Sequence, residues 1–202
     1  MIDPYVRPRI DPPLNALGRW LADVGVRADQ VTMASFAFGI GGVVAIALGA
    51  PLAGLGLILA GRLADGLDGA VARATAKTDR GGFLDITLDF WFYGLVPVAF
   101  AILDPGRNAV AAAILVSSFF ANGSSFLAFA IMAAKRNIET TVQGQKSLFY
   151  MTGLVEGAET IGFFVLFCLF PDYFPWLAGL MAAMCYVSAG VRVVLAYRVL
   201  AP

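Results

Sequence analysis

Long apolar stretches constrain this chain more than any other feature of its sequence. Six of them are each long enough to cross a hydrocarbon core of about 30 Å as a helix: residues near 31–50, 52–75, 82–103, 108–134, 151–170 and 174–198. Hydrophobic residues make up 59% of the chain and charged residues 14%, a balance more apolar than one soluble core requires. The sequence therefore predicts an all-α, polytopic integral membrane protein with six transmembrane helices.

The connections between these stretches are short and rich in helix breakers. Examples are Ala50-Pro51, Asp104-Pro105-Gly106 and Pro171-Asp172. No internal repeat is visible, which argues against a transporter built from inverted repeats. We expect a single domain over residues 1–202, with a cytoplasmic or interfacial segment at 1–30 and a six-helix bundle at 31–202.

The segment before the first span has its own pattern. Residues 1–30 lack the continuous apolar region of a signal peptide. From Asp11 to Val26, apolar residues recur at helical spacing at Leu14, Leu17, Leu21 and Val24. This pattern favours an N-terminal interfacial amphipathic helix over an ordinary loop.

Basic residues predict the orientation in the membrane. They gather before the first span, at the second and fourth connections and after the last span, whereas the opposite side has only Arg107. Because cytoplasmic loops carry the excess of lysine and arginine, both termini and these connections should be cytoplasmic. We expect a bacterial inner (plasma) membrane protein.

Composition excludes several kinds of chemistry. The net charge is zero, so nothing points to nucleic acid as a partner. The chain has no histidine, so metal binding and proton transfer must depend on carboxylates. Cys168 and Cys185 lie in different apolar stretches and are interpreted as buried small residues.

Four aspartates lie where an apolar helix should avoid them. Asp65 and Asp68 are three residues apart, and Asp85 and Asp89 are four apart, so each pair shares a helix face. A carboxylate at the bilayer centre costs at least about 2.5–3.5 kcal/mol. The loop between the two helices is short, so we expect antiparallel packing that brings their cytoplasmic ends, and with them the four carboxylates, together. Oxygen ligands select Mg²⁺, Mn²⁺ or Ca²⁺, so the cluster predicts a metal site. The alternative to a metal site is a set of buried salt bridges from these acids to Arg62 or Arg73.

These residues form a pattern that resembles the signature of the CDP-alcohol phosphotransferases. The family's usual form is D-x2-D-G-x2-A-R-x8-G-x3-D-x3-D, and every fixed letter is present as Asp65-x2-Asp68-Gly69-x2-Ala72-Arg73 and Gly81-x3-Asp85-x3-Asp89. Seven residues, not eight, separate Arg73 from Gly81, which predicts a shortened loop.

The resemblance implies an activity and roles for the residues. It implies metal-dependent transfer of a phosphoryl-alcohol group from a CDP-alcohol to an acceptor alcohol, with release of CMP, in phospholipid biosynthesis. Two divalent cations, Mg²⁺ or Mn²⁺, would be held by Asp65, Asp68, Asp85 and Asp89, with Asp89 also the candidate catalytic base. The CDP group would bind at Asp65, Gly66, Gly69, Ala72 and Arg73. The usual donor is CDP-diacylglycerol; a small CDP-alcohol with a diacylglycerol acceptor is the other possibility.

Further intramembrane and loop charges are candidates for acceptor binding. They are Arg192, Lys135, Arg136, Lys146, Glu156 and Glu159. The alternatives are a structural glutamate–arginine pair between helices and loop charges that only set the topology.

Two other functions compete with the enzyme. A membrane ion or metal transporter would place acids along a pathway, whereas these cluster at one end of two helices. An inactive relative that only binds nucleotide or lipid is the second alternative. Gly153-x3-Gly157 and the resemblance allow a homodimer.

Overall fold

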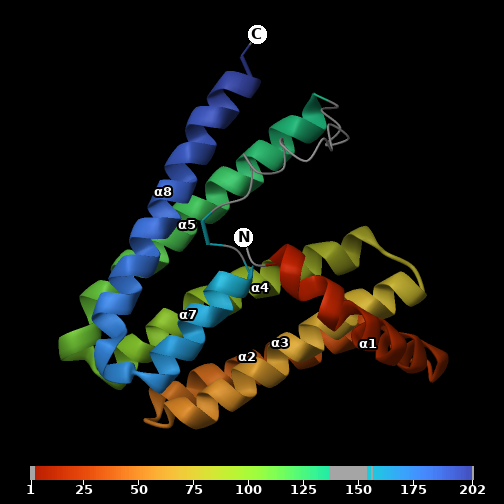
Figure 1. The fold of residues 1–202 in the computed structure, drawn as a ribbon, viewed down its shortest axis with the longest axis horizontal. Helices are drawn as coiled ribbons and strands as arrows, with labels where there is room; N and C mark the ends of the chain where they lie inside the picture. The colour runs from red at the N-terminus through yellow and green to blue at the C-terminus, as the bar shows by residue number, and fades with distance from the viewer. Residues whose placement is uncertain (1–2, 137–153, 156, 202) are drawn as a thin grey trace.

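The computed structural model describes residues 3–136, 154–155 and 157–201, and in these the chain is helical with no strand (Figure 1). The predicted all-α class is confirmed. The helices in chain order are α1 (Asp3–Asp23), α2 (Ala28–Ala47), α3 (Pro51–Ala74), α4 (Asp79–Leu103), α5 (Pro105–Lys135), α7 (Gly157–Leu169), the short 3₁₀ helix η1 (Pro171–Tyr173) and α8 (Phe174–Val199).

Four segments of the described chain are long and apolar enough to cross a membrane. They are α2, α4, α5 and η1 with α8. Helix α3 has 24 residues but carries Arg62, Asp65 and Asp68 within its length. The described part of α7 has 13 residues. The count of six spans therefore stays a prediction.

Local chemistry explains where the helices begin and end. Pro51 and Pro105 occupy the first position of α3 and α5, where a missing N–H costs nothing. The Thr78 side chain accepts a hydrogen bond from the Gly81 N–H at 3.0 Å and caps α4. After α2, Gly49 turns the chain with φ 88°, a conformation that favours glycine.

Helices α2 and α3 pack at very close range along a seam of glycines. A Cβ added at Gly54 would lie 2.8 Å from the Gly42 carbonyl oxygen, and one at Gly42 would lie 2.9 Å from the Gly54 carbonyl oxygen. Nearer the other end of the pair, the Ser35 hydroxyl donates to the Gly61 carbonyl at 2.9 Å. Because backbone meets backbone, the two helices form one tightly fitted pair.

Helix α1 lies across α3, and a Cβ at its buried Gly18 would be 2.5 Å from the Ala70 side chain (Figure 1). The predicted start at Asp11 is wrong, because α1 begins at Asp3. Pro12 and Pro13, which ordinarily open a helix, fall inside it. Of the predicted apolar face, Leu14 lies against Gly66 whereas Leu17 is exposed, so the amphipathic interfacial role stays a prediction.

The predicted meeting of the ends of α3 and α4 is seen in their carboxylates, but the two helices are not closely packed along their lengths. Helix α2 packs along both of them, and α3 and α4 have no comparably close backbone contact with each other. Charged side chains fill the space between them: Arg62 of α3 reaches Asp89 of α4. Elsewhere α5 packs on α4 and α8, so that α5 and α8 form a second arm that rises away from the α2–α3 pair (Figure 1).

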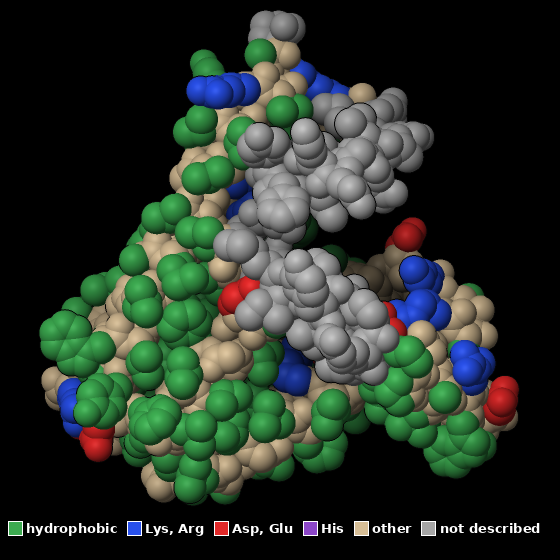
Figure 2. Space-filling view, in the orientation of Figure 1, with side chains coloured by type: hydrophobic (Ala, Val, Ile, Leu, Met, Phe, Trp, Pro, Cys, Tyr) green, Lys and Arg blue, Asp and Glu red, His purple; other side chains and the backbone are tan. Residues whose placement is uncertain are grey.

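The apolar core lies where the two arms meet. It includes Phe92 and Phe100 of α4, Phe164 and Phe167 of α7, and Phe174 of α8, all fully buried. Outside it, hydrophobic side chains cover much of the visible face, and charged side chains show both at its edges and near its centre (Figure 2). Such a surface suits a lipid environment, and the chain is an integral membrane protein.

Candidate active site

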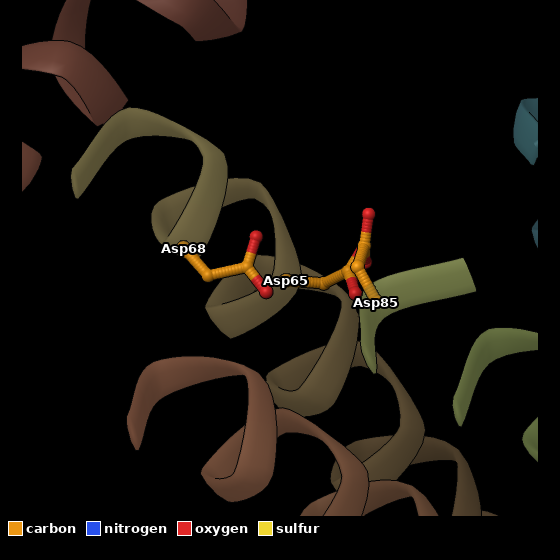
Figure 3. A group of neighbouring side chains, drawn as sticks. All are labelled: Asp65, Asp68 and Asp85. Carbon is orange, nitrogen blue, oxygen red and sulfur yellow. The ribbon is translucent and has the colours of Figure 1, made fainter. Parts of the chain in front are cut away.

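Three of the four aspartates converge at one point. Asp65 and Asp68 come from neighbouring turns of α3, and Asp85 reaches them from the first turns of α4 (Figure 3). One carboxylate oxygen from each lies within 4.8 Å of those of the other two. Three anionic oxygens this close repel one another unless a cation lies among them.

Asp68 is held by a residue that sequence reasoning missed. The Thr32 hydroxyl of α2 donates to the Asp68 Oδ2 atom at 2.6 Å, and both residues are buried. The bond fixes the orientation of the carboxylate, which contributes an oxygen to the cluster. Thr32 lies 36 positions from Asp68, so nothing in the local sequence pattern links them.

Asp89 forms a close ion pair with Arg62 and is not one of the three clustered carboxylates. The Arg62 Nη1 atom donates to the Asp89 Oδ1 atom at 2.7 Å and lies 3.5 Å from the Asp65 Oδ2 atom. The alternative of salt bridges to the acids therefore holds for Arg62, which pairs with both Asp89 and Asp65, but all three side chains are half-buried rather than buried. It does not hold for Arg73, which is exposed and donates to the Asn15 Oδ1 atom of α1 at 2.9 and 3.1 Å.

A pocket of about 700 Å³ opens beside the carboxylates. The turn between α1 and α2, the end of α3 and the start of α4 enclose it, and Asp68 and Asp85 form part of its wall. Of the predicted CDP-binding residues, Gly69, Ala72 and Arg73 line this pocket. Asp65 and Gly66 are not among its lining residues, and Gly66 instead faces Leu14 of α1.

The mouth of the pocket is basic. Arg27, Lys77 and Arg80 line it together with Arg73. One of these charges is partly neutralised, because Arg80 pairs with Asp29 at 2.5 Å. The pocket wall thus combines the buried Asp68 and the half-buried Asp85 with exposed cations, which suits a ligand with both metal-bridged and free phosphate oxygens.

Of the predicted acceptor residues that the structure describes, Arg192, Lys135 and Arg136 lie on the α5–α8 arm, and Glu159 lies on α7, which packs on α3 and α8. Buried Arg192 of α8 donates from Nη1 to both the backbone and side-chain oxygens of Asn122 on α5, at 2.9 and 2.8 Å. Lys135 and Arg136 are exposed at the end of α5, and Glu159 is half-buried in α7. Lys146 and Glu156 lie outside the described residues.

The carboxylate cluster fits a divalent cation. All its donors are oxygens, the type that Mg²⁺ and Mn²⁺ prefer, and the cluster adjoins a pocket large enough for a ligand that would complete the coordination. The hydrogen bond from Thr32 gives Asp68 the kind of outer support that metal-binding carboxylates usually have.

A helical membrane protein with an aspartate cluster beside a basic-rimmed pocket is suited to transferring phosphate-linked groups at the membrane. The model of the CDP-alcohol phosphatidyltransferase family matches residues 26–194, and the chain belongs to this family. It is accordingly a transferase of substituted phosphate groups, and the resemblance seen in the motif is confirmed.

Two curated relatives share sequence with the chain. Inner membrane protein YnjF of Escherichia coli (strain K12) is 47% identical over 193 residues, which cover 96% of this chain and 94% of that protein. Archaetidylinositol phosphate synthase of Pyrococcus horikoshii is 40% identical over 86 residues, or 42% of this chain and 45% of the synthase.

A solved structure shares the fold. It is the crystal structure of Mycobacterium tuberculosis phosphatidylinositol phosphate synthase (PgsA1) with CDP-DAG bound. The TM-score is 0.65 at 20% identity, with 91% of this chain and 93% of that chain covered.

Proposed function

We propose that this enzyme transfers a phosphatidyl group from CDP-diacylglycerol to an acceptor alcohol and releases CMP. The observation that carries the proposal is the convergence of Asp65, Asp68 and Asp85 beside a pocket of about 700 Å³ in a member of this family. The relative crystallised with CDP-DAG and the archaetidylinositol phosphate synthase support a lipid donor. A small CDP-alcohol would meet the same carboxylates and the same basic rim.

Asp65, Asp68 and Asp85 would hold divalent cations, Mg²⁺ or Mn²⁺, with Asp89 beside them. When bound, such ions neutralise charge on the diphosphate and stabilise the departing CMP oxygen. Within the pocket, the exposed cations would pair with the remaining phosphate oxygens, and Arg73 is the cation that belongs to the motif. Gly69 and Ala72 have small side chains, so the nucleotide could approach the backbone of α3 closely at these positions.

The reaction is a substitution at the phosphorus that carries the diacylglycerol. The acceptor hydroxyl oxygen forms a bond to this phosphorus, the bond from phosphorus to the bridging oxygen breaks, and CMP leaves with that oxygen. Asp89 would accept the hydroxyl proton, as a carboxylate held within the site can. The same residue could instead contribute to a second metal position, as the resemblance also allows.

The acceptor would bind towards the α5–α8 arm. Arg192, Lys135, Arg136 and Lys146 are the proposed partners of an acceptor phosphate, with Glu156 and Glu159 near them in the chain. The hydrogen bonds from Arg192 to Asn122 hold its guanidinium in a fixed orientation. We place the site on the cytoplasmic side of a bacterial inner membrane because the connections next to it are basic; the name of the YnjF relative supports that membrane. A homodimer stays part of the proposal.

One experiment tests the activity. Purified protein is incubated with labelled CDP-diacylglycerol, Mg²⁺ or Mn²⁺ and a panel of alcohols, and the products are identified by lipid mass spectrometry. We expect CMP and one new phospholipid with a matching acceptor, and neither product in the presence of a chelator. Metal-independent product, or no product with any acceptor, would contradict the proposal.

A further inference from the structure

Arg73, the cation of the motif, is held by a side chain of α1. Its Nε and Nη2 atoms both donate to the Asn15 Oδ1 atom, at 3.1 and 2.9 Å. Arg73 is exposed and lines the pocket, whereas Asn15 is half-buried and is not one of the lining residues. Asn15 can therefore influence a ligand in the pocket through Arg73.

The two hydrogen bonds use only one edge of the guanidinium. The Nη1 atom of Arg73 has no hydrogen-bond partner among the described residues. It lies 3.3 Å from the place that a Cβ at Gly69 would take, and Gly69 also lines the pocket. Asn15 thus binds the edge formed by Nε and Nη2, and Nη1 stays beside the pocket wall, where a phosphate oxygen can accept from it.

Close packing of α1 on α3 fixes the position of Asn15. Before it in the sequence, Leu14 lies against Gly66. After it, a Cβ at Gly18 would be 2.8 Å from the backbone carbonyl carbon of Ala70. With a close contact on either side, the amide of Asn15 has little freedom to shift along α3. An exposed arginine otherwise samples many rotamers, and restraint before binding removes part of the entropic cost of holding a ligand.

The chemistry of the partner matters as much as its place. An amide oxygen accepts from a guanidinium without cancelling its positive charge, whereas a carboxylate at the same position would cancel it and repel a phosphate. Arg80 shows the other case in the same pocket, because it pairs with the carboxylate of Asp29. Asn15 therefore orients Arg73 and leaves its charge available to a ligand.

We propose that Asn15 is a positioning residue for the donor: it directs the Nη1 atom of Arg73 towards the diphosphate of the CDP-alcohol. The docking of α1 on α3 then becomes a requirement for tight donor binding, through a residue that lies outside the motif. The inference rests on the function proposed above, and it concerns donor affinity rather than metal binding or the chemical step.

The test is a double-mutant cycle on the purified whole chain in detergent. CDP is titrated calorimetrically, in the presence of Mn²⁺, into the wild type, Asn15→Ala, Arg73→Gln and the double variant. Asn15→Ala should raise the Kd for CDP at least about fivefold, because an unrestrained guanidinium binds phosphate less well. In the Arg73→Gln background the same change should alter the Kd by less than about twofold, because nothing is left to position. Leu17→Ala is the matched control, since it shortens an exposed side chain of the same helix and should leave the Kd unchanged.

Asn15→Asp separates orientation from charge. It keeps an acceptor for Arg73 but adds a negative charge, so the Kd for CDP should rise at least as far as in Asn15→Ala, while the melting temperature stays at or above that of the wild type. This variant decides the matter if Asn15→Ala fails to fold. A purely structural Asn15 predicts that Asn15→Asp binds CDP as the wild type does, and that Asn15→Ala weakens CDP binding equally in both backgrounds. Either result would overturn the proposal.

Turnover distinguishes this inference from the proposed function. Wild-type protein that binds CDP but releases no CMP from CDP-diacylglycerol would refute the proposed function, and the CDP titrations would still decide the role of Asn15. Wild-type protein that does not bind CDP would overturn both. With CMP release intact, additive effects of Asn15→Ala and Arg73→Gln on the Kd would overturn the role of Asn15 alone.

Discussion

The hydrogen bond from Thr32 to Asp68 offers the most direct test of the metal site. Thr32→Val replaces the hydroxyl with a methyl group of nearly the same size, so the buried position stays filled. The substitution removes a bond of 2.6 Å to a carboxylate oxygen and leaves the carboxylate itself in place. The other contact of this hydroxyl, at 3.1 Å to the Ala28 carbonyl, lies within α2 and away from the carboxylates, so a change in metal binding reports the lost support of Asp68.

The expected magnitude follows from the type of bond. Hydrogen bonds to charged groups contribute about 1.5–3 kcal/mol, and removal of an outer partner of a metal ligand typically costs about 10–100-fold in affinity. Asp68 is 7% exposed, so water is poorly placed to replace the lost donor. We therefore expect the Kd for Mn²⁺ to rise at least about tenfold.

The assay is calorimetric titration of Mn²⁺ into the detergent-solubilised protein, beside Ser118→Ala as control. Ser118 is also buried, but its hydroxyl donates to the Leu115 carbonyl within α5, away from the carboxylates. The control should bind Mn²⁺ as the wild type does. An unchanged or tighter Kd for Thr32→Val would refute the reasoning, because Asp68 would then need no support from α2.

Four further changes test the remaining parts of the site and fold. Asp85→Asn removes a charged oxygen from the cluster and should abolish turnover and weaken Mn²⁺ binding; full turnover without added metal would contradict a metal-dependent reaction. Asp89→Asn should keep most of the donor affinity and lose at least about 100-fold in transfer rate; an equal loss of donor binding would make Asp89 chiefly a ligand. Gly69→Leu should block CDP binding by filling the pocket wall, which a CDP titration measures, and unchanged affinity would place the nucleotide elsewhere. Gly54→Leu should lower the melting temperature in detergent, since its Cβ would lie 2.8 Å from a backbone oxygen of α2, and overpacking of this kind costs about 1–3 kcal/mol; an unchanged melting temperature would mean that α2 and α3 can separate without cost.

The sequence predicts the helices well because their ends are marked by local chemistry. The stretch expected near 82–103 is α4 from Asp79 to Leu103, and that near 52–75 is α3 from Pro51 to Ala74. Proline, glycine and a threonine cap act on neighbours only a few residues away, so a single sequence shows them. The loop between α3 and α4 is short, as predicted, and Thr78 at its end caps α4.

The partners of the site residues could not be predicted in the same way. The motif identifies Asp68, but its partner Thr32 comes from another helix and belongs to no local pattern. Asn15 binds Arg73 from 58 positions away, and only the crossing of α1 over α3 brings the two together. The short loop correctly predicts that the ends of α3 and α4 meet, but it does not show that α2 packs along both helices. Charged side chains between α3 and α4 need space that a tight helix contact does not leave.

The glycine seam between α2 and α3 determines how accurately the cluster is built. No side chain separates Gly42 from Gly54, so there are no rotamers whose change would let one helix shift against the other. Helices α2 and α3 therefore form one rigid pair. Thr32 and Asp68 lie on the same two helices several turns from these glycines, so a rigid α2–α3 pair fixes the separation of the two residues. The alignment of the carboxylate oxygens therefore depends on a backbone contact several turns away. A single methyl group added at Gly42 or Gly54 would disturb that alignment without touching the site.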